Sequence, residues 1–170
     1  MLMNLTAKRL RQVVDYDPQT GIFVARIRRG KITPGKIVGV IEENKKKKYK
    51  RLKFAIDGKY YFSHRLAWLW VHGSWPERDL DHINRDTFDN RLCNLRLATN
   101  SQNMANARMP ITNKSGKKGV SWHARGMKWQ AHVKVRCISR YLGLFNTVEE
   151  AHASYCQAAK TFQGEFARSE

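Results

Sequence analysis

The chain has 170 residues, of which 42% are hydrophobic, and this suffices for the core of one ordinary domain or of two small ones. It carries 32 Lys and Arg residues against 14 Asp and Glu, a formal net charge of +18. Such a surface gains free energy by releasing counterions from phosphates, so we expect nucleic acid as partner and no membrane, because no basic amphipathic helix is predicted.

The cysteines and the N-terminal stretch exclude two further classes of protein. Cys93, Cys137 and Cys156 include no CxxC pair, which argues against a disulfide framework and against a zinc ribbon. We therefore expect reduced thiols and no structural zinc. No apolar run reaches the ~20 residues that cross a bilayer, and the first residues lack the apolar segment of a signal peptide. We expect an intracellular, cytoplasmic protein.

The first fifty residues predict short elements separated by glycines. A short helix is expected within residues 1–14, with Thr6 as its N-cap. Residues 20–27 and 36–41 predict strands. Residues 45–53 form a basic run, which we interpret as a phosphate contact, with a solvated loop as the alternative.

A hairpin and a helix follow this basic run. Residues 51–62 alternate around Asp57-Gly58, which is a strong signal for a two-residue turn. Ser63 is expected to cap a largely apolar helix that ends at Gly73. His64, in the first turn of that helix, is interpreted as structural rather than functional.

The remaining chain predicts a linker and a second module. Residues 98–109 form a short helix capped by Thr99 or Ser101, and residues 111–118 have the composition of a linker. Beyond it, residues 119–123, 129–136 and 140–145 predict three strands. The middle strand alternates apolar and polar side chains, and Thr147 with Glu150 forms a capping box for a helix that ends at Gly164.

Residues 80–103 contain the side chains with the most chemistry. Cleavage of a phosphodiester needs a base for water, a cation at the leaving oxygen and a fixed geometry. Asp81 offers a hard oxygen that suits Mg²⁺, and His82 has an imidazole whose pKa lies near working pH. Asn103 offers a neutral carbonyl oxygen as a second metal ligand. The stretch predicts one metal-dependent nuclease centre.

This stretch closely resembles the HNH nuclease motif, in which a β-hairpin and a helix surround one metal, the ββα-metal fold. His82 is the first position, Asn94 the middle one and Asn103 the third, and the DNR triplet Asp89–Arg91 also fits. The resemblance implies that His82 is the general base and that Asp81 and Asn103 bind one divalent metal ion, Mg²⁺ or alternatively Mn²⁺. It implies that Asn94 bonds the loop backbone and fixes His82.

The likeness extends over roughly residues 1–109, through DYDPQTG, HRLAWL and the DG hairpin, and is greatest to phage and intron-encoded homing endonucleases. An infected bacterial host is therefore the expected setting. Three arginines near the motif are candidates for phosphate contact, with surface salt bridging as the alternative: Arg85, Arg91 and Arg96.

Residues 114–168 resemble the Apetala/ethylene-response-factor DNA-binding domain through KKGVSW, KWQAHVKV, RYLGLF, TVEEAHASYCQAA and GEFA. That family lays a three-stranded antiparallel sheet in the major groove and backs it with one helix. Nothing in the sequence predicts the aromatic platforms of single-strand readers. The DNA-facing candidates are Lys118, Ser121, Trp122, His123, Arg125, His132, Lys134, Arg136, Arg140 and Tyr141.

Together these patterns predict an α+β chain in two parts. Residues 1–110 form a ββα-metal nuclease domain preceded by a small β-rich region, 111–118 a linker, and 119–170 a three-stranded antiparallel sheet packed on one helix. The expected activity is HNH homing-type hydrolysis of phosphodiester bonds in double-stranded DNA. A monomer would nick one strand, whereas a homodimer would cut both. The alternatives are a non-catalytic DNA-binding transcription regulator with a relic HNH fold and an RNA-binding protein.

Overall fold

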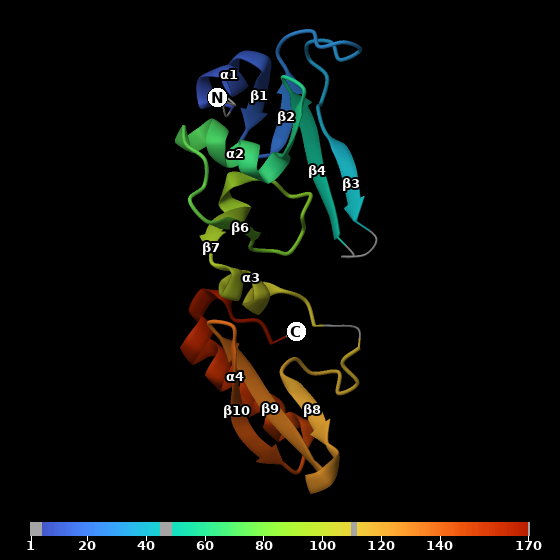
Figure 1. The fold of residues 1–170 in the computed structure, drawn as a ribbon, viewed down its shortest axis with the longest axis vertical. Coiled ribbons are helices and arrows are strands. Elements are labelled where there is room, and N and C mark those ends of the chain that lie inside the picture. The colour runs from blue at the N-terminus through green and yellow to red at the C-terminus, as the bar shows by residue number, and fades with distance from the viewer. Residues whose placement is uncertain (1–4, 45–48, 110–111, 170) are drawn as a thin grey trace. The chain divides into compact units, whose positions relative to one another are not determined.

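The computed structural model describes residues 5–44, 49–109 and 112–169. Residues 45–48 of the predicted basic run, residue 110 and the first residue of the predicted linker, 111, lie outside the described residues. The chain groups into two compact units that divide between Leu97 and Ala98. The described residues contain four α-helices and several small sheets, which confirms a mixed α/β chain (Figure 1). None of these helices is long and apolar enough to span a membrane.

The first unit begins with helix α1 (Ala7–Val13), and Thr6 caps it by accepting a hydrogen bond from the Arg9 amide, as predicted. Strand β1 (Val14–Asp17) continues directly from the helix and pairs antiparallel with β2 (Ile22–Ala25). Strand β1 was not predicted, because four residues without a preceding turn give too short a pattern to separate from the helix.

A three-stranded antiparallel sheet follows, with the order β3-β4-β5. Its strands are β3 (Val40–Asn44), β4 (Tyr49–Ile56) and β5 (Lys59–Phe62). Positive φ values at Asp57 and Gly58, 48° and 77°, form the tight turn between β4 and β5, so the predicted hairpin is confirmed.

Helix α2 (Ser63–His72) follows β5 without a loop and ends at the left-handed Gly73, as expected. Ser63 is not its cap: Phe62 occupies the N-cap position, and Ser63 is the first helical residue. The prediction was wrong by one position because β5 extends to the helix. The buried Leu66 and Leu69 join the core of the unit, which also includes Leu10 of α1.

The last two strands of the first unit, β6 (Asp79–His82) and β7 (Leu95–Ala98), pair with each other. A long loop connects the two strands, and its last residues form a 3₁₀ turn, η1 (Leu92–Asn94). Of the residues predicted to carry the chemistry, Asp81 and His82 therefore lie at the end of β6 and Asn94 lies in this loop.

The second unit begins with the end of β7 and helix α3 (Asn100–Asn106), which Thr99 and Gln102 close with a capping box. Three antiparallel strands follow in the order β10-β9-β8, namely β8 (Val120–His123), β9 (Lys128–Val135) and β10 (Ile138–Phe145). Helix α4 (Val148–Gln163) starts at the predicted capping box and packs on β9.

The apolar face of β9 meets α4 as its alternation predicts, since Val133 is fully buried against Tyr155 of the helix. The strand, however, ends one residue earlier than predicted. Arg136 and Cys137 have φ values of 50° and 67° and form the turn to β10, so Arg136 does not lie on the polar face of the strand. Neither residue is the glycine or asparagine that usually announces such a turn.

Candidate active site

His82 lies at the end of β6, buried to 7% exposure, between two polar partners from distant parts of the first unit. Its Nε2 atom lies 3.3 Å from Oδ1 of Asn90, and its ring meets the His64 ring edge-on at 5.2 Å between centroids. Burial lowers the pKa of His82, and the Asn90 hydrogen bond opposes this only in part. The imidazole is therefore neutral at pH 7, the form that can accept a proton.

His64 is the residue of this site that the sequence failed to assign. It is the second residue of α2, is 6% exposed, and stacks on Phe62 on one side while the His82 ring lies on another. Eighteen residues of chain separate the two histidines, and no local pattern shows that they meet. The signal available was the polar His at the start of an otherwise apolar helix.

Burial lowers the pKa of His64 to about 3, and the nearby His82 and arginine charges add to the effect. In the unfolded chain its pKa is near 6.5. Between these two values the unfolded state binds a proton that the folded state does not, so stability falls as the pH falls below about 6.5.

We expect the free energy of unfolding to drop by about 2 kcal/mol between pH 7 and pH 5 from His64 alone. Urea unfolding at both pH values measures this, with His64→Gln as the comparison because carboxylates contribute equally in both proteins. The variant is expected to lose less stability on acidification than the parent. An equal loss in both would show that His64 protonates normally in the folded state.

Asp81 precedes His82 and is held by an arginine from the paired strand. Its Oδ2 atom accepts from Nε of Arg96 at 2.9 Å, and the Nη2 atom of the same guanidinium lies 2.9 Å from it. Both side chains are about nine-tenths buried, at 10% and 12% exposure. Arg96 is one of the candidates for phosphate contact. In the structure its guanidinium pairs with Asp81, and phosphate contact stays a prediction.

Asn94 binds the loop that follows His82 at both of its ends. Its Oδ1 accepts from the Asn84 amide at 3.0 Å, and its Nδ2 donates to the carbonyl of Asp89 at 2.8 Å and to Oδ1 of Asn84 at 3.0 Å. The Ile83 amide donates to the Asn94 carbonyl at 2.9 Å. The bonds to the Asn84 amide and the Asp89 carbonyl join the Asn94 side chain to the loop backbone, as the resemblance implies for this position, and they hold the chain just after His82.

The loop itself is held by side chains within it. Arg91 forms a two-pronged pair with Asp89, with donor–acceptor distances of 2.8 and 2.7 Å, and this pair lowers the pKa of the Asp89 carboxyl. The Asp86 carboxylate accepts from the Phe88 amide, and Arg85 takes a positive φ of 66°. Phosphate contact by Arg85 and Arg91 stays a prediction, and half of the Arg91 side chain is exposed for it.

The β1–β2 hairpin forms hydrogen bonds to the same loop. The Tyr16 hydroxyl donates to the Asn90 carbonyl at 2.7 Å, and the Leu92 amide donates to the Pro18 carbonyl at 3.3 Å. Gly21, with a φ of 74°, lies so close to this loop that a Cβ there would be 2.6 Å from the Asn90 carbonyl carbon. Only glycine permits this approach.

Asn103, predicted as the second metal ligand, lies in the middle of α3, an element of the second unit. Its role as a ligand stays a prediction. Among the described residues no group of three or more His, Cys, Asp or Glu side chains could hold a metal ion.

The predicted DNA-facing residues of the second unit fall into two groups. In two of them the side chain bonds the backbone: the Lys118 ammonium donates to the carbonyls of Ala105 and Ala107, and Nδ1 of His123 accepts from the Gly126 amide. The others lie exposed or half-buried on the strands and turns of the sheet, and their contact with DNA stays a prediction: Ser121, Trp122, Arg125, His132, Lys134, Arg136, Arg140 and Tyr141.

Comparison with known proteins gives a family match in the same part of the chain. Residues 61–105 match the family model described as HNH endonuclease. The match includes the end of β5, α2, the paired strands β6 and β7 and most of α3, and with them His64, Asp81, His82, Asn94 and Asn103. The HNH endonuclease domain at residues 61–105 thus covers the predicted site residues Asp81, His82, Asn94 and Asn103.

A curated relative, Protein 3.8 of Escherichia phage T7, is 35% identical to the chain over 71 residues. The aligned region is 41% of this chain, and it spans only 59% of the length of that relative. No solved structure gives a significant match.

Proposed function

We propose that the protein is a metal-dependent DNA endonuclease in which His82 is the general base for hydrolysis of the phosphodiester. The observation that carries the proposal is the buried, neutral His82 imidazole, adjacent to Asp81 and held between Asn90 and His64 within the HNH match. A neutral imidazole in a fixed position can take the proton of an attacking water molecule. Asn94 holds the following loop and so keeps His82 in place.

Asp81 and Asn103 would hold one divalent cation, with Mg²⁺ preferred, because a carboxylate and a carboxamide supply the hard oxygen ligands that this ion requires. An ionised carboxylate has about four acceptor positions, so a carboxylate that accepts from a guanidinium, as Asp81 does from Arg96, can also ligate a metal. The bound cation would stabilise charge on the leaving oxygen. Arg96 would hold the carboxylate in one orientation.

The three-stranded sheet of the second unit would supply target binding, as in the ethylene-response-factor-like domain that its sequence resembles. Arg125 and Lys134 are both exposed, and the net charge of +18 supports binding of phosphates. The resemblance to phage proteins supports a homing-type role in an infected bacterial host.

Exchanging both Arg125 and Lys134 for Gln is expected to reduce the slope of log affinity against log salt by about 2, since each phosphate contact contributes close to one unit. Fluorescence anisotropy with duplex DNA at several salt concentrations measures the slope. The matched control replaces two exposed lysines of the first unit, Lys8 and Lys59, in the same way. An equal change of slope in both double variants would contradict the proposal that the three-stranded sheet supplies the phosphate contacts.

The cleavage proposal is tested with supercoiled plasmid and genomic DNA of the host. We expect conversion to nicked or linear plasmid in Mg²⁺ or Mn²⁺, and complete loss of cutting with a chelator that is restored by added metal. Binding without metal-dependent cutting on any of these substrates would favour the alternative, a DNA-binding regulator with a relic HNH fold. Nicked product indicates a single centre acting alone, and linear product indicates two chains.

A further inference from the structure

The outer face of the β3-β4-β5 sheet carries cations and aromatic rings side by side. Because neighbouring residues of a strand point to opposite faces, Phe54 and Ile56 enter the core while Arg51 and Lys53 lie on the other face. Antiparallel pairing places Lys53 opposite Phe62. The Arg51 guanidinium lies 5.5 Å from the Phe62 ring centroid.

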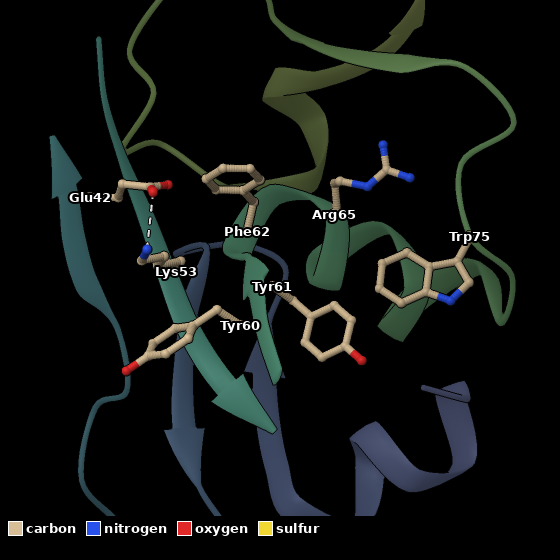
Figure 2. Close-up of a pocket in the computed structure, with 7 residues that line it drawn as sticks. All are labelled: Glu42, Lys53, Tyr60, Tyr61, Phe62, Arg65 and Trp75. Atoms are coloured by element: carbon tan, nitrogen blue, oxygen red, sulfur yellow. Dashed lines mark hydrogen bonds and ion pairs between the residues drawn. The ribbon is translucent and has the colours of Figure 1, made fainter. Parts of the chain in front are cut away.

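This face continues into a cavity of about 440 Å³ beside α2, shown in Figure 2. Its size falls within the roughly 300–1,000 Å³ of small-ligand sites. Aromatic rings form most of its wall, and two cations and one carboxylate complete it. The lining residues are Glu42, Lys53, Tyr60, Tyr61, Phe62, Arg65 and Trp75.

The rings of the wall are held in place by the fold. Tyr61 stacks on Trp75 at 5.6 Å, and the Trp75 Nε1 atom donates to the Leu5 carbonyl at 3.0 Å. Tyr60, by contrast, is 63% exposed, and the Lys53 ammonium lies 4.9 Å from its ring centroid. A flat ligand could therefore stack on Tyr60 without a rearrangement of the core.

The charge of the cavity favours an anionic ligand with an aromatic part. Glu42 is its single carboxylate among the lining residues, and it is paired with Lys53 at 3.0 Å. Arg65 lies 5.7 Å from the Trp75 ring centroid and extends to the rim in Figure 2. Bases stack on aromatic side chains while their phosphates meet cations, which is the combination found here.

The cavity is connected to the candidate active site through a chain of rings. Phe62, a lining residue, stacks on His64 at 5.7 Å, and His64 meets His82 at 5.2 Å. The cavity is therefore two ring contacts away from the proposed general base. Cleavage of a duplex at a buried site is helped when the strand to be cut is distorted, and a pocket for an unpaired base would hold that distorted form.

We propose that this cavity binds an unstacked nucleobase of a DNA strand, with the base on Tyr60 and the adjoining phosphate near Lys53 and Arg65. The proposal rests on the proposed function for the choice of DNA as partner. No local pattern in the sequence indicates such a site, because its rings and cations come from two strands, a helix and a loop that meet only in the folded unit.

The test measures binding of the full chain to a short oligothymidylate in the presence of chelator, so that cutting does not enter. Loss of one base–aromatic stack weakens binding by several-fold to about a hundredfold. Tyr60→Ala is expected to weaken oligothymidylate binding about tenfold and to leave binding of an abasic oligomer with the same number of phosphates within about twofold. Tyr60→Phe is expected to bind like the parent.

Phe162→Ala is the matched control, since Phe162 is also an exposed ring beside a cation, Arg140, but lies in the second unit. It is expected to leave oligothymidylate binding unchanged. An unaltered affinity of Tyr60→Ala, an equal loss on the abasic oligomer, or tighter binding of the matching RNA would each overturn the proposal. A parent protein that binds as expected but never cuts DNA would overturn the nuclease function alone.

Discussion

His82→Ala is expected to lower the rate of metal-dependent plasmid cleavage by at least about 100-fold, because general-base catalysis contributes roughly 10²–10⁴-fold. Affinity for duplex DNA should stay within about twofold, since the buried ring offers its surface to Asn90 and His64 rather than to solvent. Time courses of nicked and linear product give the rate, and anisotropy in chelator gives the affinity.

His72→Ala is the matched control for this experiment. His72 is an exposed histidine at the end of the same helix that carries His64, and its ring packs on Trp68 at 4.1 Å. This variant is expected to cut at the parental rate. Normal cutting by His82→Ala would exclude His82 as the base, and thermal unfolding of both variants verifies that each is folded.

Asn94→Ala is expected to reduce the free energy of unfolding by about 2–4 kcal/mol and to reduce cleavage along with it. The truncation removes one acceptor and two donated hydrogen bonds, and it leaves the Asn84 amide and the Asp89 carbonyl without this partner in a partly buried loop. Each buried polar group left unsatisfied costs about 1–3 kcal/mol. Urea unfolding measures the loss.

Asn94→Asp tests the two donated hydrogen bonds alone. It keeps a side chain of similar size and the acceptor for the Asn84 amide, and it loses both donated bonds. It should be less stable than the parent and cut more slowly. Asn146→Ala, at an exposed position before α4, should change stability by less than about 0.5 kcal/mol. A parental stability for Asn94→Ala would contradict the bracing role.

The elements predicted from sequence are those that local chemistry determines. Thr6, Thr99 and Thr147 each cap a helix by bonding an amide three residues later, and Asp57-Gly58 forms its turn from its own backbone preferences. Asp81 and His82 on β6 and Asn94 in the loop that follows lie near one another because they are close in the chain. Local signals also mislead, as at Ser63, where the strand continues to the helix and leaves no room for a side-chain cap.

What the sequence could not show are the partners that come from far along the chain. His64 meets His82, and Arg96 meets Asp81, only because α2, β6 and β7 pack in one unit. Pairings of this kind depend on register and packing rather than on periodicity. The same holds for the aromatic cavity, whose lining residues are spread between Glu42 and Trp75.

The contacts of the β1–β2 hairpin with the site loop determine how short a segment can keep the geometry of the candidate site. The family match begins at residue 61, yet the carbonyl of Asn90 rests on the Tyr16 hydroxyl, and Gly21 abuts the same stretch of backbone. A segment of residues 61–105 fused to an unrelated protein would contain His82 but would lack the hairpin residues that contact its loop. Grafted versions should therefore include the chain from α1 onward, or lose the geometry around Asn90.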